Sequence, residues 1–243
     1  MEKLRSTWYS TRLRKNVTAV RFGHYGAPLL LFPTAGGDAE ECERMLMIKA
    51  LSPLIDAGRL KVYSCDSVAG QTWIDKNASP GHKAWVQNQY DGYVYEELVP
   101  HIRRDCDSSD IEILTAGASL GGFNAVASVC RHPDVFKTAV SMSGTFDFTG
   151  WMEGQHPVDF HMASPIHFLR HLEEGHQLRA LRRRFIIFAV GEGRWERPSN
   201  SWGMAKVLGQ RGVPNRVDMW GRNHDHDWPS WREMLPKYMS EMV

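Results

Sequence analysis

The chain has 243 residues, and its 29 Lys and Arg against 28 Asp and Glu give a formal net charge of +1 at pH 7. Hydrophobic residues make up 42% and charged residues 23% of the sequence, which excludes a disordered, collagen-like or coiled-coil chain. A chain of this length buries a sizeable core without disulfides or a structural metal. The near-zero net charge argues against binding to nucleic acid or to an anionic membrane surface.

The sequence favours a cytoplasmic protein. Residues 1–16 carry charges but no apolar run of signal-peptide length, and nowhere are 18 consecutive residues apolar. The four cysteines, Cys42, Cys65, Cys106 and Cys130, lie far apart without C-x-x-C spacing. We therefore expect reduced thiols and no zinc or redox site.

The apolar pattern predicts a sheet with an antiparallel start and parallel strands after it. Residues 7–13 and 17–22 are predicted to pair antiparallel across the polar segment 14–16. The later predicted strands are short and mostly apolar, as in sheets covered on both faces: 29–32, 61–65, 111–115, 137–142, 185–190 and 216–220. Helical spacing is found at 40–57, 89–105, 120–131, 165–172, 199–211 and from 228 onwards. This alternation predicts one α/β domain over residues 1–243.

The least regular segment is 146–184, which is rich in His, Trp and Met. We expect it to be an insertion that forms part of a pocket wall, with Trp151, His156 and His161 facing the substrate. Arg182–Arg184 lie near a helix end, where a charge run is normally solvated, so no function is assigned to them.

A candidate nucleophile is Ser119. The motif Gly117-Ala118-Ser119-Leu120-Gly121 follows a predicted strand and opens a predicted helix, which is the context of the G-x-S-x-G nucleophile elbow. The flanking glycines are expected where the sharp turn leaves no room for a Cβ. The alternative is that Ser119 only caps the helix.

A serine nucleophile requires a general base, which α/β-hydrolases supply from a histidine after the last strand. Two candidates follow 216–220, and His226 is preferred over His224 because Asp227 and Pro229 predict a helix cap that holds it on a stiff junction. The H-x-H spacing also suggests a metal site. However, Trp228 and Pro229 stand where the metallo-hydrolase pattern H-x-H-x-D-H requires Asp and His.

The triad acid is expected in the loop 191–196, after the strand 185–190. Glu192, Glu196 and Asp218 are the candidates, and Glu196 is preferred because Gly193 allows the loop to turn toward the histidine. The same loop is a near match to the dinucleotide motif G-x-G-x-x-G, but Glu196 stands in place of the third glycine.

An oxyanion hole would use backbone N–H groups. The first donor would be Leu120, next to the candidate nucleophile. The second would come from the loop after the strand 29–32, where Thr34 and Ala35 are the candidates and Gly36 is expected to line the substrate pocket.

Taken together, these segments resemble the putative-esterase branch of the α/β-hydrolases, which includes S-formylglutathione hydrolases, feruloyl esterase domains and mycolyltransferases. The resemblance covers 32–37, 117–122, 191–196 and a tail in which His226, Trp228 and Trp231 match the family's His-x-Trp-x-x-Trp pattern. It implies an eight-stranded α/β-hydrolase sheet with helices on both faces, an acyl-enzyme route and no cofactor. Many members place aspartate in the acid loop, whereas this chain has glutamates there, which is nearer to the mycolyltransferase pattern.

We therefore expect a serine carboxylesterase for small acyl esters or thioesters, with Ser119 as nucleophile, His226 as base and Glu196 as acid. The alternatives are an acyltransferase with the same triad, a nucleotide-binding oxidoreductase that uses the loop 191–196, and a non-catalytic scaffold. The expected partner is a small-molecule ester, without metal, nucleic acid or membrane, and the sequence is compatible with a homo-oligomer.

Overall fold

The computed structural model describes residues 1–243, and its strands form one eight-stranded sheet of order β1-β2-β4-β3-β5-β6-β7-β8. The strands are β1 (Lys3–Ser10), β2 (Lys15–Phe22), β3 (Ala27–Phe32), β4 (Leu60–Cys65), β5 (Ile113–Ala118), β6 (Phe136–Met142), β7 (Phe185–Val190) and β8 (Asn215–Met219). β2 pairs antiparallel with both β1 and β4, and the other pairs are parallel. The predicted α/β class and mostly parallel sheet are confirmed.

The first hairpin lies closer to the amino terminus than predicted. β1 ends at Ser10, and residues 11–14 form the turn, in which Arg14 adopts a left-handed φ of 52°. The carboxylate of Glu97 accepts hydrogen bonds from the side chains of Trp8, Ser10 and Thr11. These contacts from a distant helix close the strand before its alternating pattern ends, which the local sequence does not reveal.

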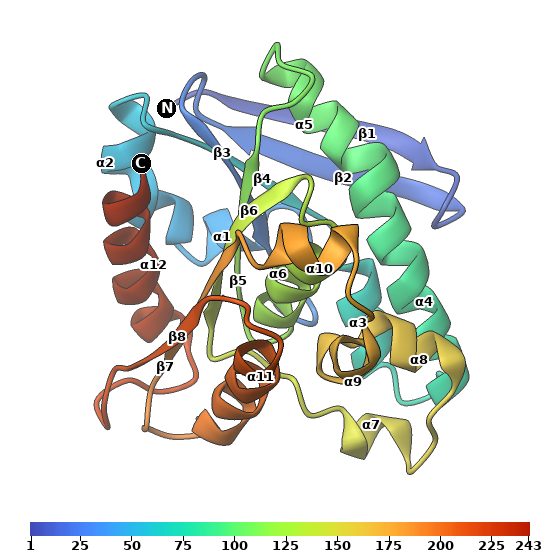
Figure 1. Ribbon diagram of the computed structural model, residues 1–243. Helices are drawn as coiled ribbons and strands as arrows, with labels where there is room; N and C mark the ends of the chain where they lie inside the picture. The colour runs from blue at the N-terminus through green and yellow to red at the C-terminus, as the bar shows by residue number, and fades with distance from the viewer.

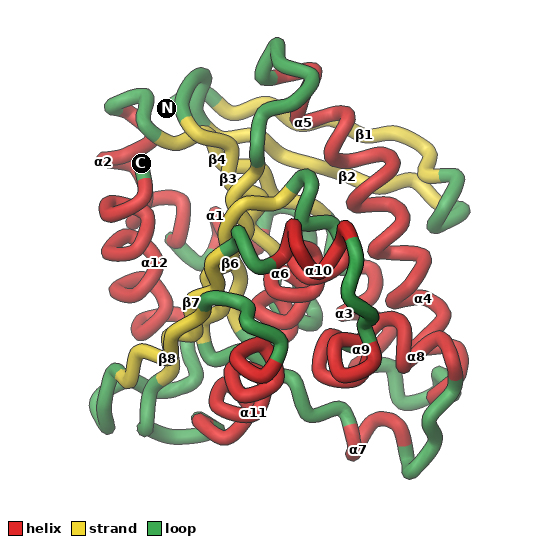
Figure 2. Tube along the Cα trace, viewed as in Figure 1, coloured by secondary structure: helices red, strands yellow, loops and turns green.

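Helices cover both faces of the sheet, as Figures 1 and 2 show. One face packs against α1 (Glu41–Arg44), α2 (Met47–Asp56) and α12 (Trp228–Met242). The other packs against α3 (Val68–Ile74), α4 (Pro80–Tyr93), the π-helical η1 (Val94–Leu98), α5 (Val99–Asp105), α6 (Leu120–Arg131) and α11 (Pro198–Gln210). The sheet therefore separates two buried cores. None of the helices has the length and apolar character needed to cross a membrane.

Two helix predictions were wrong in their extent. The predicted helix 40–57 is interrupted at Leu46, whose φ of 63° separates α1 from α2. The predicted helix 89–105 begins instead at Pro80, because the side chain of Ser79 accepts a hydrogen bond from the N–H of His82 and caps α4. A Ser-Pro pair is a start signal for a helix, since proline suits the first helical position.

The segment 146–184 consists mainly of four short helices, α7 (Thr149–Met152), α8 (Val158–Ala163), α9 (Pro165–His171) and α10 (His176–Leu181). An aromatic cluster joins it to the rest of the molecule. The ring of Trp73 in α3 lies 4.6 Å from that of Phe148 and 5.9 Å from that of Trp151. This packing holds α7 beside the carboxyl edge of the parallel strands.

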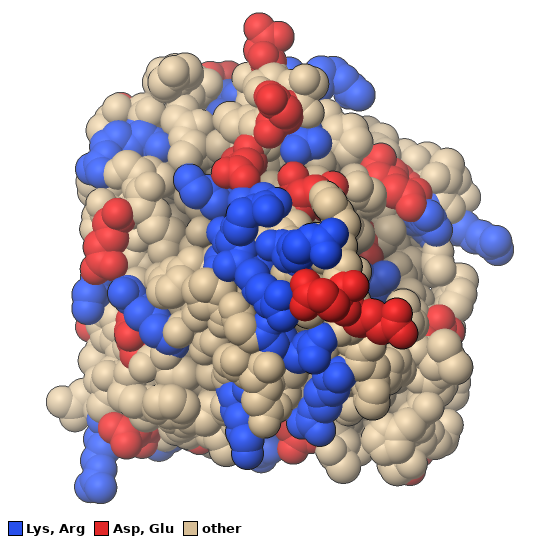
Figure 3. All heavy atoms as spheres, viewed as in Figure 1, with Lys and Arg blue, Asp and Glu red and all other residues tan.

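Basic side chains form a stripe on the face shown in Figure 3, with acidic side chains beside it. Arg182 pairs with Glu174 at 2.9 Å and Arg184 with Glu112 at 2.5 Å. Two members of the arginine run are thus engaged in surface ion pairs, which fits the interpretation that this run forms no site.

Candidate active site

Ser119 stands at the sharp turn between β5 and α6, with φ of 56° and ψ of −120°. A Cβ at Gly117 would lie 2.3 Å from the backbone of Gly121, and one at Gly121 would lie 2.5 Å from the carbonyl oxygens of Phe32 and Pro33. Glycine is therefore required at both positions for the turn to pack against β3. The side chain of Ser119 makes no capping hydrogen bond to α6, so the capping alternative finds no support.

Ser119 lines a cavity of about 600 Å³ at the carboxyl edge of the sheet, called here the active-site cavity. Parallel strands end at one common edge, so residues that follow β5, β6 and β7 meet there. Apart from its two indoles the lining is polar or glycine. Besides Ser119, the lining residues are Ser143, Gly144, Thr145, Asp147, Gly150, Trp151, Trp195, Arg197, Asn200 and His226.

The structure brings His226, and not His224, to the active-site cavity. Asp227 caps α12 by accepting the N–H of Ser230, and the ring of His226 lies edge-on to that of Trp231 with 5.2 Å between centroids. The Nε2 atom of His224 instead lies 3.2 Å from the carboxylate of Glu233. The predicted helix cap therefore exists and fixes the chain next to His226.

Glu196 is the carboxylate that faces this histidine. Its side chain is 1% exposed, and its Oε2 lies 3.7 Å from Nδ1 of His226 without a hydrogen-bond partner. Its Oε1 accepts hydrogen bonds from the hydroxyl of Ser143 at 2.5 Å and from the N–H of Gly191 at 3.3 Å. A separation somewhat longer than a hydrogen bond is common in unliganded active sites.

The other acid candidates do not face His226. Glu192 is exposed, and Asp218 in β8 pairs with Arg216 at 3.0 Å. Asp225, a near neighbour in sequence, pairs with Arg194 at 3.0 Å.

The loop 191–196 also lacks the free N–H groups that a pyrophosphate would need. The N–H of Glu192 donates to Gly221, that of Gly193 to the carbonyl of His224, and that of Arg194 to the side chain of Asp225. A dinucleotide-binding loop keeps such groups directed at the ligand. The geometry therefore opposes the oxidoreductase alternative.

The two predicted oxyanion donors after β3 differ in one decisive contact. Glu41 accepts both the N–H and the hydroxyl of Thr34, each at 2.7 Å, so the N–H of Thr34 is already used. The N–H of Ala35 donates no hydrogen bond. Leu120 is the first residue of α6, whose N–H has no partner within the helix. Thr34 is thereby unsuitable, while Ala35 and Leu120 remain available.

Of the predicted pocket residues, only Trp151 lines the active-site cavity. His156 and Gly36 are exposed outside it. His161 lines a different cavity together with His132 and His171. α8, which contains His161, packs on α4, and His156 lies in the loop that precedes α8.

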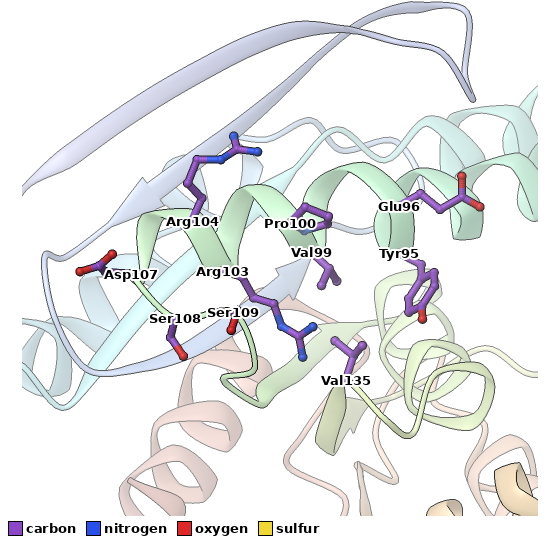
Figure 4. A pocket seen from close by; sticks show the side chains of 10 residues that line it. All are labelled: Tyr95, Glu96, Val99, Pro100, Arg103, Arg104, Asp107, Ser108, Ser109 and Val135. Carbon is purple, nitrogen blue, oxygen red and sulfur yellow. The ribbon is translucent and has the colours of Figure 1, made fainter.

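A larger cavity of about 760 Å³ lies beside η1 and α5 (Figure 4). The side chains of Tyr95, Arg103 and Val135 converge on it. Val135 directly precedes β6, so this cavity lies at the amino edge of the sheet, opposite Ser119. Its lining includes Ser108 and Ser109 but no histidine, and it therefore offers no nucleophile–base pair.

Sequence reasoning gave no role to Ser143, Arg197 and Asn200, which line the active-site cavity, or to Glu41, which bonds to Thr34. A usable signal existed for Ser143, because Ser143-Gly144 directly follows a predicted parallel strand and must lie at the same edge as Ser119. Glu41 and Asn200 act through contacts with distant backbone groups, for which the local sequence carries no signal.

Comparison with known proteins agrees with this geometry. Residues 52–241 match the family described as Putative esterase. No curated protein matches the sequence.

Several solved structures share the fold. A ferulic acid esterase superposes with a TM-score of 0.76 at 16% identity, covering 100% of this chain and 99% of its own. An S-formylglutathione hydrolase from Staphylococcus aureus gives 0.73 at 15% identity, covering 99% and 98%. MPT51 of Mycobacterium tuberculosis gives 0.66 at 14% identity, covering 100% and 98%. Since the family match covers most of the sequence, the chain belongs to the Putative esterase family, and it shares the fold of these solved esterase structures.

Proposed function

We propose that this esterase hydrolyses small acyl esters or thioesters through an acyl-enzyme intermediate, with Ser119, His226 and Glu196 as its catalytic triad. The observation that carries the proposal is their geometry. Ser119 and His226 line one cavity, and the buried carboxylate of Glu196 faces Nδ1 of His226 across 3.7 Å.

In the proposed reaction, the Oγ of Ser119 attacks the carbonyl carbon of the ester while His226 accepts its proton. Glu196 holds the imidazole in the required tautomer and stabilises the imidazolium that forms. His226 then gives the proton to the leaving alcohol or thiol, and the acyl group remains on Ser119. A water molecule attacks the acyl-enzyme with His226 again as base, which releases the carboxylic acid and restores the serine.

We propose that the N–H groups of Leu120 and Ala35 stabilise the negative charge on the carbonyl oxygen. Fixed donors aimed at developing charge contribute strongly to such reactions. The bonds from Thr34 to Glu41 support this choice, because they hold the loop after β3 and leave Ala35 free. Every step uses side chains and backbone groups of this chain, so the proposal requires no metal or cofactor.

The proposed compartment is the cytoplasm, and the proposed partner is the small-molecule ester alone. All four cysteines are free, and three of them are buried: Cys42, Cys65 and Cys130. Burial raises the pKa of Cys65 to about 12, so this thiol stays protonated and unreactive at neutral pH. Such thiols suit a reducing compartment.

The test is a panel of p-nitrophenyl esters of increasing acyl length, assayed with and without acceptor alcohols. Ser119→Ala should lower turnover roughly 10³-fold or more and abolish labelling by a fluorophosphonate. Product that appears mainly as a new ester in the presence of an alcohol would identify an acyltransferase. Normal turnover by a folded Ser119→Ala protein would refute the serine mechanism.

A further inference from the structure

We infer that the active-site cavity contains an anion subsite formed by Arg197 and Asn200, and that the preferred ester carries a carboxylate on its acyl or alcohol part. The inference rests on the proposed function, because it assigns a substrate class to the cavity of Ser119. It concerns residues to which neither the motifs nor the family resemblance gives a role.

Arg197 is the one cationic side chain of Lys or Arg type in the lining of the active-site cavity. It is exposed, and it makes neither an ion pair nor a side-chain hydrogen bond. The nearby Arg194 differs in both respects, since its guanidinium pairs with Asp225 at 3.0 Å and it does not line the cavity. A guanidinium presents N–H groups in a planar fork that matches a carboxylate. Arg197 therefore offers an unused fork to the substrate.

Asn200 adds donors on the same side of the cavity. Its Oδ1 accepts the backbone N–H groups of Phe146 at 2.7 Å and of Asp147 at 2.8 Å. These two bonds fix which way the amide points, because only the oxygen can accept them. The Nδ2 group makes no hydrogen bond, so its two N–H donors remain for a ligand. An acceptor-only group such as a carboxylate complements this pair of residues.

Asp147 is the only acidic residue in the lining, and it has a structural contact. Its carboxylate accepts the N–H of Thr149 at 3.0 Å at the start of α7. The side-chain and backbone hydrogen bonds from Thr149, and to a smaller extent the positive charge of Arg197, hold the pKa of Asp147 below its ordinary value, so it is charged at neutral pH. This charge weakens the attraction of the cavity for an anion without occupying the fork of Arg197. Removing the negative charge of Asp147 by substitution therefore tests the proposed subsite.

The test compares esters of equal length that differ in one charge. The first pair is 4-nitrophenyl hemiadipate against 4-nitrophenyl hexanoate, with the carboxylate on the acyl part. The second is 4-acetoxybenzoate against the neutral, similarly sized 4-acetoxybenzamide, with the carboxylate on the alcohol part. We expect the charged member of one pair to have the higher kcat/KM, and Arg197→Gln to reduce that preference about tenfold, mainly through KM.

Two further variants test whether the effect is specific to the charge of Arg197. Arg194→Gln removes an equal charge nearby and should leave the preference unchanged. Asp147→Asn should increase the preference, because it removes a negative charge while the amide oxygen can still accept the N–H of Thr149. Absence of a preference in both pairs, or an equal loss in Arg194→Gln, would overturn the subsite, while hydrolysis of the neutral esters would leave the proposed function standing. Failure of all four esters together with absent fluorophosphonate labelling would instead refute the proposed function, and the subsite with it.

Discussion

The hydroxyl of Ser143 donates a hydrogen bond to Oε1 of Glu196 across 2.5 Å, while the Oγ of Ser143 accepts one from the indole N–H of Trp231 at 3.0 Å. The indole can only donate, so it fixes the direction of the serine hydroxyl. Oε1 is thereby occupied, and Oε2 is the oxygen left to face His226. The last helix thus orients the acid loop through one serine.

Removing the Ser143 hydroxyl should impair catalysis more than folding. Ser143 has a left-handed φ of 49°, a conformation that glycine adopts without strain. Ser143→Gly should therefore lower kcat roughly tenfold to a hundredfold, because a buried carboxylate loses its partner, with little change in KM. Steady-state kinetics together with thermal unfolding separates the two effects.

Trp231→Phe is the companion variant, because it deletes the indole N–H and keeps most of the packing. It should lower kcat in the same direction as Ser143→Gly, and the double variant should cost less than the two losses added together. An unaltered kcat in Ser143→Gly would show that Glu196 is oriented by other groups.

The two tail histidines should differ strongly in their effect on activity. His226→Ala should be about as damaging as Ser119→Ala, since members of a triad act as a unit. His224→Ala removes the contacts with Glu233 and with the ring of Trp220, neither of which involves the active-site cavity, and should retain most of the activity. The measurement is kcat/KM for a short p-nitrophenyl ester, repeated with a chelator, which should change nothing. The reverse ranking would move the general base to His224.

The acid can be tested by a matched pair of substitutions. Glu196→Gln keeps the shape of a buried side chain but cannot hold His226 in its working tautomer, so turnover should fall by orders of magnitude. Glu192→Gln alters an exposed carboxylate and should behave like the wild type. A crippled Glu192→Gln beside a normal Glu196→Gln would make our assignment wrong.

Trp151 should limit the length of the acyl group. It is the pocket residue predicted from the segment 146–184 that lines the active-site cavity, and its ring packs 5.9 Å from that of Trp73. Trp151→Ala opens space on that side, so the rate profile over acyl length should shift toward longer esters. An unchanged profile would mean that the acyl chain lies elsewhere, for example along Trp195.

The strand order and the site differ in how far the sequence reveals them. Short apolar runs locate each parallel strand to within a few residues, because strands buried on both faces have few polar positions. The position of Ser119 can be predicted from the glycines that a tight turn requires. The position of His226 can be predicted from Asp227 and Pro229, which mark the start of the last helix. These signals are local, and Ser119 and His226 line one cavity in the structure.

The remaining features depend on contacts between distant segments. The end of β1 is set by Glu97, and the placement of His161 is set by the packing of α8 on α4. Arg197 becomes notable only when Asp225 is seen to pair with its neighbour Arg194. Composition and periodicity do not reveal contacts between distant segments. The pocket residues could therefore not be predicted as well as the turn that carries Ser119.

Glu41 should act as a positioning residue for the oxyanion hole. Its carboxylate accepts both donors of Thr34 at 2.7 Å, and Thr34 immediately precedes Ala35. Glu41→Ala removes both acceptor oxygens, so both bonds are lost and the loop can move away from Ser119. We expect kcat to fall roughly tenfold to a hundredfold and binding of a boronic acid transition-state analogue to weaken in parallel, while KM changes little.

The control for this prediction is Thr34→Val, which deletes only the hydroxyl bond and leaves the bond from the N–H of Thr34 to Glu41. It should lose less activity than Glu41→Ala, because the N–H of Thr34 stays bonded to Glu41. A simple loss of stability would lower the unfolding temperature of both variants without weakening the boronic acid relative to the substrate. If the N–H of Thr34 were itself the oxyanion donor, releasing it in Glu41→Ala would raise kcat and tighten the boronic acid, and that result would reverse the assignment of Ala35.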